Sequence, residues 1–499
     1  MSTIKDLEPK NVWNNFYLLT RQPRPSKHEE KVRAFLLEWA KEKGVEAFAD
    51  ETGNVIMRAP ATKGYENRRG VILQAHMDMV PQKTAETRHD FLTDPIETEV
   101  LGEWLGAKGT TLGADDGIGV ALAMAVVEDK SLPHGPVEVL ITYDEETGMT
   151  GAEKLRPGLF KGDILLNLDS EDEGELCIGC AGGLDGIGDF SYKTMKAPRG
   201  YKAFRIGVKG LQGGHSGMDI SLYRANACKI IARALLPLLQ KYGAKVAGIH
   251  AGSLRNAIPF EGTADVLLPA DKAKAAEAKV RKIFHDVYEE FKDTDPGAKF
   301  SYERLVPKPA SYIEDKVMLN AVKAILACPA GVVRMSSAFK GLTETSTNLA
   351  MIRCGRGHLR VYSLMRSAVN SAKAQLASEM RCVFELAGAK FTTAGGYSGW
   401  TPKPDTPVYK VVCDVWKKVS GKKMTVNATH GGLECALLGA KYPNWEMASI
   451  GPTIVHPHSP DERVKIDTVG NGWEFLKELL LAIPAKKYAG LSRDARIVP

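Results

Sequence analysis

Three short runs of apolar residues occur early in the chain. They span 71–75, 137–143 and 164–168, and each has the length of a strand that is buried on both faces of a sheet. Residues 117–128, which are rich in Ala, Val and Met, follow a turn of Gly and Asp and predict a helix between the first two runs. Strands that alternate with helices indicate a mostly parallel α/β sheet.

A further helix is predicted near the start of the chain. Val32 and Leu36 belong to a set of large apolar residues that repeat at helical spacing. Ser26 and Glu29 have the spacing of a capping box, so we expect this helix to begin at Ser26 and to end at Gly44.

The middle of the chain has a different pattern, in which polar and apolar residues alternate. Residues 204–208 and 264–268 predict half-buried strands, and a long helix is expected at 271–291. The first pattern resumes later, with helices expected at 408–418 and 468–482.

These patterns predict an α/β fold in which a mixed, mostly parallel sheet with flanking helices carries an inserted α+β domain. We expect residues 1–186 and 397–499 to form the first domain and residues 187–396 to form the inserted one. The insert is long enough to hold two similar units. Residues 485–499 form a short basic tail for which we expect no regular structure.

Composition narrows the functional classes. The 66 Lys and Arg residues are dispersed among 60 Asp and Glu residues, so no nucleic-acid-binding surface is indicated. No apolar stretch is long enough to span a bilayer, and the first residues lack the order of a signal peptide, so we expect a cytoplasmic protein.

Eight scattered cysteines suit a reducing compartment. Cys177 and Cys180 are spaced as CxxC, but no second pair accompanies them, and we interpret both as core residues.

Residues that can bind metals or transfer protons follow each of the three apolar runs. In chain order they are His76, Asp78, Asp144, Glu145, Glu146 and Asp169. The carboxyl ends of strands are where ligands bind in such sheets. The turn at 113–119 adds Asp115 and Asp116, and a late segment at 457–462 adds His458.

Two imidazoles and several carboxylates suit a pair of divalent cations that share one carboxylate, which is the arrangement of hydrolytic two-metal sites. Asp78 could accept the second N–H of the His76 ring and fix its tautomer. The adjacent acids Glu145 and Glu146 suggest a division of roles, in which one faces a metal and the other acts as a base.

Five segments of the chain resemble the aminoacyl-histidine dipeptidases, also called Xaa-His or cytosolic non-specific dipeptidases. This family belongs to the aminoacylase and carboxypeptidase superfamily of co-catalytic zinc hydrolases. The segments are 23–29, 73–83, 109–119, 144–151 and 167–172, within a resemblance that extends from Leu7 to Pro484. The resemblance implies hydrolysis of dipeptides, of Xaa-His type such as carnosine and with broad specificity. It also implies that the first domain is catalytic and that the insert is a lid that clamps the substrate.

The resemblance implies two divalent metal ions, with Zn²⁺ as the first choice and Mn²⁺ or Co²⁺ as alternatives. Asp115 would bridge the two ions. His76 and Asp169 would complete the site of one ion, and Glu146 and His458 would complete the site of the other.

The resemblance also implies roles in catalysis and substrate binding. Glu145 would be the general base that takes a proton from a water held between the metals, and Asp78 would orient a metal ligand. His215, in a Gly-Gly-His-Ser-Gly segment of the lid, would lie near the oxyanion. Asn256 and Arg366 resemble the family's clamps for the peptide backbone and the terminal carboxylate, which a guanidinium group suits.

Four other acidic and histidine residues lie in or near these motifs and are not assigned as metal ligands. Several relatives have Asn at the position of Asp116, so the bridging role goes to its neighbour. His456 lies two residues before His458, but the family motif favours His458. His430 and Glu434 match another family segment and receive no role.

Two other functions stay open. One is a tripeptidase or an N-acyl-amino-acid amidohydrolase with the same two-metal site, and the other is a catalytically inactive peptide-binding protein. The presence of Glu145 and of all five expected metal ligands argues against an inactive protein. The expected partner is a small peptide substrate, without nucleic acid or membrane, and a homodimer stays an open alternative to a monomer.

Overall fold

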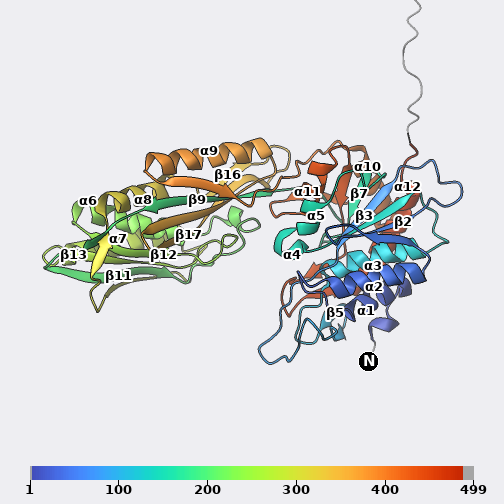
Figure 1. The fold of residues 1–499 in the computed structure, drawn as a ribbon, viewed down its shortest axis with the longest axis horizontal. Coiled ribbons are helices and arrows are strands. Elements are labelled where there is room, and N and C mark those ends of the chain that lie inside the picture. The colour runs from blue at the N-terminus through green and yellow to red at the C-terminus, as the bar shows by residue number, and fades with distance from the viewer. Residues whose placement is uncertain (1–2, 487–499) are drawn as a thin grey trace, which may run out of the picture. The chain divides into compact units, whose positions relative to one another are not determined.

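The computed structural model describes residues 3–486 of the chain (Figure 1). These residues form two compact units. The first unit comprises the described residues of Met1–Ile178, Lys403–Asn427 and Leu437–Pro499, and the second comprises Gly179–Pro402 and Ala428–Ala436. The functional division into a catalytic domain and a lid stays a prediction. The tail expected at 485–499 lies, from residue 487 on, outside the described residues.

An eight-stranded sheet forms the centre of the first unit, in the order β1-β2-β6-β3-β7-β21-β8-β20. Its strands are β1 (Glu46–Ala49), β2 (Val55–Ala59), β3 (Val71–His76), β6 (Val137–Thr142), β7 (Ile164–Asn167), β8 (Glu175–Cys180), β20 (Thr425–Thr429) and β21 (Glu446–Ser449). The central strands β6, β3, β7 and β21 pair in parallel, whereas β1 with β2, β2 with β6 and β8 with β21 pair antiparallel. The predicted mixed α/β fold is confirmed, with its parallel pairing in the middle of the sheet.

The three apolar runs become the neighbouring strands β6, β3 and β7, as predicted. Every residue of these strands is buried. Val71 is opposite both Val137 and Ile164, so the three strands start in register and end at the same edge of the sheet.

The helix α3 (Ala114–Glu128) shows how the turn of Gly and Asp leads into the core. Gly113 has a φ of 70°, and Asp115 and Asp116 have non-helical backbone angles, so the regular helix begins at Gly117 as predicted. The residues of α3 from Ala114 to Val127 are buried, because small and apolar side chains let the helix pack against both α1 and β3.

The helix α2 (Glu30–Glu42) begins later than predicted. The backbone N–H and the hydroxyl of Ser26 both donate to the carbonyl of Met79, and the Glu29 carboxylate accepts from the backbone N–H of Lys27. The predicted start at Ser26 is therefore wrong, because a tertiary contact with the chain after β3 takes the place of the expected capping box.

The other elements of the first unit complete the layers around this sheet. They are η1 (Ile4–Asp6), α1 (Lys10–Thr20), β4 (Thr98–Leu101), β5 (Trp104–Ala107), α4 (Glu145–Gly148), α5 (Thr150–Lys154), α10 (Pro407–Ser420), β22 (Ile454–Val455), β23 (Arg463–Lys465) and α12 (Ile466–Ala482). The helix α11 (Glu434–Lys441) has its first three residues in the second unit and the rest in the first. The helices α10 and α12, both predicted, pack on each other. The strands β22, β23, β5 and β4 form a small second sheet in that order.

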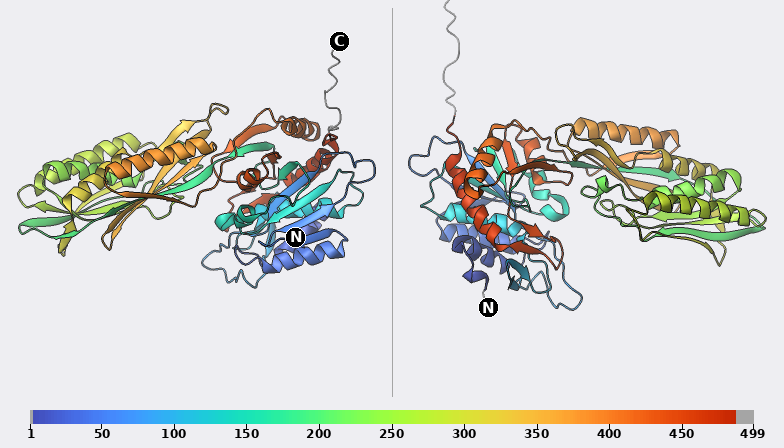
Figure 2. Two further views of the ribbon diagram at one scale, coloured as in Figure 1. Left: turned by 45° about the horizontal axis from the view of Figure 1, so that its top comes forward. Right: turned by 180° about the vertical axis from the view of Figure 1, so that it is seen from behind.

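The second unit is an α+β sandwich of one sheet and one helical layer. Its main sheet has the order β14-β11-β13-β12-β17-β18-β9-β19, with β16 paired to β17. The strands are β9 (Gly182–Ser191), β11 (Tyr201–Lys209), β12 (Lys245–Ala251), β13 (Gly262–Pro269), β14 (Lys299–Arg304), β16 (Gly331–Met335), β17 (Thr343–Gly355), β18 (His358–Ser367) and β19 (Lys390–Ala394), with a separate pair β10 (Thr194–Lys196) and β15 (Ser311–Ile313). Figures 1 and 2 show the helices on one face of this sheet.

The helices of the second unit are amphipathic and cover a continuous apolar core. They are α6 (Ala227–Lys241), α7 (Ala273–Phe291), α8 (Asp315–Ala327) and α9 (Asn370–Leu386), with the short η2 (Ile220–Leu222). Cys177 and Cys180 are buried, as the sequence predicts. Between residues 3 and 486, no helix is both long and apolar enough to cross a membrane.

Candidate functional site

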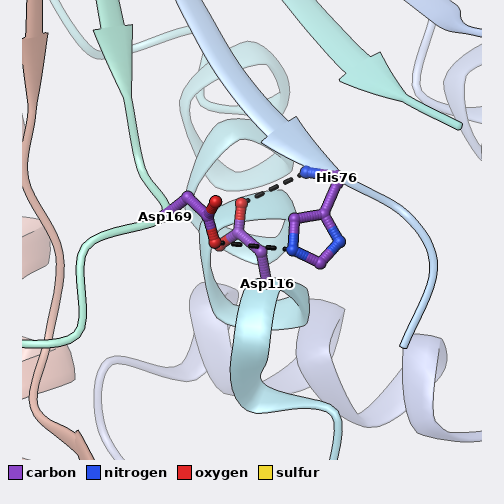
Figure 3. A group of neighbouring side chains, drawn as sticks. All are labelled: His76, Asp116 and Asp169. Atoms are coloured by element: carbon purple, nitrogen blue, oxygen red, sulfur yellow. Dashed lines mark hydrogen bonds and ion pairs between the residues drawn. The ribbon is translucent and has the colours of Figure 1, made fainter. Parts of the chain in front are cut away.

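Three strand ends bring metal-competent side chains to one edge of the central sheet. His76 is the last residue of β3, Asp169 follows β7, and the short helix α4, with Glu145 and Glu146, follows β6. Because the three strands are parallel neighbours, their carboxyl ends meet. Figure 3 shows the side chains of His76 and Asp169 facing each other, with 3.4 Å between His76 Nε2 and Asp169 Oδ1.

Asp115 lies between two imidazole rings. Its Oδ1 is 3.1 Å from Nε2 of His76, and its Oδ2 is 3.0 Å from Nε2 of His458. Asp115 and His76 are buried, while the His458 side chain is half-exposed. One carboxylate therefore faces two ring nitrogens that come from positions far apart in the sequence.

Asp116, the neighbour of Asp115, forms its hydrogen bonds with backbone groups and not with imidazole rings. Its Oδ2 accepts a hydrogen bond of 3.2 Å from the backbone N–H of His76 (Figure 3). Its Oδ1 accepts one of 3.1 Å from the backbone N–H of Gly119. A Cβ at position 119 would lie 2.2 Å from Oδ1, so only glycine leaves room for this carboxylate. Both oxygens of Asp116 thus accept hydrogen bonds from backbone N–H groups, and these bonds fix the turn against the end of β3.

Glu146 and Asp78 extend the cluster on its other side. Oε2 of Glu146 is 3.0 Å from Nε2 of His458, and Glu146 is largely buried. Asp78 accepts from the backbone N–H groups of Glu145 at 3.0 Å and of Glu146 at 3.2 Å, and its Oδ1 is 3.4 Å from Nδ1 of His76. The buried Asp78 carboxylate therefore fixes both the start of α4 and the far side of the His76 ring.

Several overlapping groups of these side chains could hold a cation, since their ligand atoms lie within 4.8 Å of one another. The groups are His76 with Asp116 and Asp169, His76 with Glu145 and Glu146, and Asp115 with Glu146 and His458. We call the residues His76, Asp115, Glu145, Glu146, Asp169 and His458 the metal cluster. A fourth group, of Glu29, Asp78 and Asp144, consists of carboxylates alone.

Burial and the neighbouring charges shift the pKa values of several members of the metal cluster. Burial and repulsion by Asp115 raise the pKa of Glu146 to about 7, and burial raises the pKa of Asp169 to about 6. Hydrogen bonds with Asp115 and Glu146 raise the pKa of His458 to about 11. Burial by itself would lower the pKa of His76, but the neighbouring carboxylates outweigh it and raise that pKa. A positive charge placed among these groups would relieve their repulsion.

Two buried charged residues that received no role from the sequence hold the loops of the metal cluster. The Glu462 carboxylate accepts hydrogen bonds from the four consecutive backbone N–H groups of Leu112, Gly113, Ala114 and Asp115. The Arg24 guanidinium donates to the carbonyl groups of Met77, Asp78 and Gly113. Arg24 and Glu462 lie inside the segments 23–29 and 457–462 that sequence analysis singled out, which was their only signal.

His215, in the second unit, is fixed by the turn in which it lies. Its backbone N–H donates to the Asp219 carboxylate at 2.7 Å, and its ring Nδ1 accepts from the backbone N–H groups of Met218 at 3.1 Å and of Gly217 at 3.4 Å. A neutral imidazole that accepts at Nδ1 carries its proton on Nε2. This Nε2 lies 3.5 Å from Nη2 of Arg366.

Arg366 lies on β18 and is buried. Its Nε donates to the Ser216 hydroxyl at 3.3 Å, and its Nη1 donates to the Tyr397 hydroxyl at 3.4 Å. The backbone carbonyl of Asn256 accepts from the backbone N–H of Ser216 at 2.8 Å, so this exposed residue is adjacent to the same group. We call His215, Ser216, Arg366 and Tyr397 the Arg366 cluster.

The structure also places His430, Glu434 and His456, for which no role is predicted. His430 belongs to the second unit, where its Nε2 is 2.7 Å from the Ser346 hydroxyl. Burial, together with the charge of Arg366, lowers the pKa of His430 to about 3, so its ring is neutral. Glu434 is buried in the same unit, and the exposed His456 lies outside the metal cluster.

Comparison with known proteins identifies the class. Residues 72–482 match the model of peptidase family M20/M25/M40. The chain belongs to this family and is a metallopeptidase, a hydrolase that acts on peptide bonds, as predicted.

Individual relatives are similar over almost the whole chain. The chain is 40% identical to the cytosol non-specific dipeptidase of Escherichia coli (strain K12), over 97% of this chain and 100% of that protein. The crystal structure of aminoacylhistidine dipeptidase from Vibrio alginolyticus superposes with a TM-score of 0.89 and 43% identity, over 97% of this chain and 99% of that one. Aminopeptidase PepT from Bacillus cereus ATCC 10987 shares the fold, with a TM-score of 0.56, 16% identity, and coverage of 96% of this chain and 99% of that one. The predicted resemblance to the dipeptidases is confirmed.

Proposed function

We propose that this metallopeptidase hydrolyses the peptide bond of dipeptides, of Xaa-His type and with broad specificity. The observation that carries the proposal is the Asp115 carboxylate, whose two oxygens face His76 and His458 at 3.1 and 3.0 Å. The names of the Escherichia coli and Vibrio alginolyticus relatives describe dipeptidases, and both proteins are matched over nearly their full length. We propose the cytoplasm as the compartment, as the first of these names and the scattered cysteines suggest.

The metal cluster fits a pair of divalent cations. A buried Glu146 oxygen, Oε1, has no hydrogen-bond partner, and burial raises the pKa values of both Glu146 and Asp169. His76 and Asp169 would hold one cation, Glu146 and His458 would hold the other, and Asp115 would contact both. Imidazole and carboxylate ligands suit Zn²⁺ first, with Mn²⁺ or Co²⁺ as alternatives. When bound, the cations would lower the pKa of a water molecule and polarise the peptide carbonyl.

Glu145 would act as the general base. Its carboxylate belongs to a group with His76 and Glu146 whose ligand atoms lie within 4.8 Å of one another. From there it could take the proton of the attacking water and deliver it to the leaving amine. Asp78 would position this base, because it binds the backbone N–H of Glu145 at 3.0 Å while its other contacts hold His76.

The second unit would supply the groups that bind the substrate. His215 carries its proton on Nε2 and could donate it to the oxyanion that develops on the carbonyl. Arg366 would bind the terminal carboxylate, and Asn256 would bind the peptide backbone. With these roles, residues 187–396 would serve as a lid, and residues 1–186 and 397–499 would form the catalytic domain.

Hydrolysis of a substrate panel tests the activity. Protein loaded with Zn²⁺ should cleave carnosine and glycyl-histidine faster than a tripeptide or an N-acyl amino acid of similar composition. Loss of each substrate, followed by chromatography, measures the four rates. Faster cleavage of the tripeptide or of the N-acyl amino acid would replace the dipeptidase by that alternative, and the absence of all four activities would leave a peptide-binding protein.

A further inference from the structure

Tyr397 is held from several directions beside Arg366. Its hydroxyl is 3.4 Å from Arg366 Nη1, which is long for a hydrogen bond, so this contact by itself would not fix the ring. The Tyr397 backbone N–H donates to the carbonyl of Gly183 at 3.0 Å, and its own carbonyl accepts from Lys373 Nζ. A Cβ on Gly183 would lie 2.5 Å from the Tyr397 ring, so only glycine leaves room for it.

The position of Lys373 is unfavourable for a positive charge. It is 8% exposed, and burial lowers its pKa to about 8. It is also the fourth residue of α9, where the helix macrodipole disfavours a cation. Its Nζ lies 5.8 Å from the centre of the Tyr397 ring and donates to the Tyr397 carbonyl. Replacing Lys373 by an apolar side chain of similar length should therefore leave the fold at least as stable.

Two hydroxyl groups contact the Arg366 guanidinium at two of its nitrogens. The Ser216 hydroxyl accepts from Nε, and the Tyr397 hydroxyl accepts from Nη1. A guanidinium has five N–H donors in one plane, so the remaining hydrogens on Nη1 and Nη2 stay available. His215 does not occupy Nη2 as an acceptor, because its Nε2 carries the proton. The free hydrogens match the two oxygens of a planar carboxylate.

We infer that Tyr397, itself held by Lys373, positions the Arg366 guanidinium to bind the terminal carboxylate of a dipeptide. The inference rests on the proposed function, because it takes Arg366 as the carboxylate ligand. Tyr397 acts through Arg366 and is a positioning residue. Its removal should therefore weaken binding of substrates that have a free carboxylate and should spare those that lack one.

The test compares glycyl-histidine with its C-terminal amide in the full-length, metal-loaded enzyme. Tyr397→Phe removes only the hydroxyl, and it should raise KM for glycyl-histidine about three- to tenfold, as expected for one lost hydrogen bond. Values of kcat for both substrates, KM for the amide and the metal content should stay unchanged. A merely structural role would alter both substrates alike. Lys373→Met should shift KM in the same direction by a smaller factor.

Two variants in the second unit serve as matched controls. Tyr201→Phe removes a hydroxyl that donates to the carbonyl of Gly243 at 3.3 Å. Lys229→Met removes an ammonium that donates to the carbonyls of Leu326 and Cys328. Neither should change the preference for glycyl-histidine over its amide.

Arg366→Ala separates the failure of this inference from the failure of the proposed function. It should abolish the preference for glycyl-histidine over the amide, and adding Tyr397→Phe should cause no further loss. If Arg366→Ala loses the preference and Tyr397→Phe keeps it, the inference is overturned and the function stands. Additive losses would mean that Tyr397 contacts the substrate itself, which also overturns the inference. A wild-type enzyme without dipeptidase activity would overturn the proposed function.

Discussion

The metal cluster and the Arg366 cluster have opposite electrostatic character. In the first unit, carboxylates outnumber imidazoles, and burial together with repulsion by Asp115 raises the pKa values of Glu146 and Asp169. In the second unit, one buried guanidinium is surrounded by neutral groups, among them the ring of His430, whose pKa falls to about 3. The charge of the first cluster would favour cations, and that of the second would favour an anion. This contrast agrees with the proposed function, in which one unit would supply the chemistry of hydrolysis and the other would recognise the charged end of the peptide.

The two clusters also differ in how they are built. In the first unit, carboxylates bind backbone N–H groups at strand ends and turns, as Asp78, Asp116 and Glu462 do. In the second unit, hydroxyl groups from separate segments, Ser216 and Tyr397, hold a single side chain. We therefore expect changes in the first cluster to affect turnover, metal content and stability, and changes in the second, apart from His215 with its proposed role at the oxyanion, to affect mainly KM.

The largest effect is expected from the proposed base. Glu145→Gln keeps the size of the side chain but removes its ability to take a proton, so kcat should fall roughly 10³-fold. KM and the metal content should stay near wild-type values, in contrast to Arg366→Ala, which should change KM. Steady-state kinetics and elemental analysis measure these quantities.

Glu153→Gln is the matched control, because Glu153 is an exposed acid on the neighbouring helix α5. It should leave all three quantities unchanged. Retention of most activity in Glu145→Gln would mean that another group acts as the base.

The next effect distinguishes the two adjacent aspartates of the first cluster. Asp115→Asn should reduce the bound cations from two per chain to one or fewer, because it removes the charge that both would share. Asp116→Asn should keep both cations but lower the thermal unfolding midpoint, because a buried backbone N–H of His76 or Gly119 loses its acceptor.

Elemental analysis after dialysis and thermal unfolding of each variant measure this difference. The opposite result, with metal lost from the Asp116 variant and kept by the Asp115 variant, would make Asp116 the bridging residue.

The smallest effect concerns Glu29, a buried acid beside Asp78 and Asp144. Burial raises its pKa from the usual 4.5 to about 7, and the neighbouring carboxylates add to this. The folded state therefore keeps a proton that the unfolded state has already lost, and stability should fall as the pH rises from about 4.5 to 7. Glu29→Gln should remove this loss, which is roughly 2 to 3 kcal/mol.

The difference in unfolding midpoint between Glu29→Gln and wild type, measured across this pH range, checks the sign. Glu30→Gln, at the neighbouring exposed position, is the control and should show no such trend. A difference that stays constant with pH would mean that Glu29 titrates normally.

Much of the fold follows from local patterns. The buried strands β3, β6 and β7 are continuous apolar runs, and such runs can be stable only between two covering layers. The helix from Gly117 and the helices α10 and α12 follow from helical periodicity. The start of α2 did not follow, because Ser26 binds the carbonyl of Met79, which lies 53 residues further along the chain.

The candidate site likewise has features that follow from the sequence and features that depend on the tertiary structure. The sequence by itself determined which residue types follow the three apolar strands. Because parallel strands in register end at one edge of the sheet, these residues had to lie close together. The local pattern did not separate Asp115 from Asp116, because adjacent residues have the same signal, and only the resemblance to the dipeptidases favoured Asp115 as the bridge. The tertiary structure decided that both oxygens of Asp115 face imidazoles, while those of Asp116 accept from backbone N–H groups. It likewise decided that Tyr397 meets Arg366, since a contact between side chains distant in sequence depends on how whole strands and helices pack.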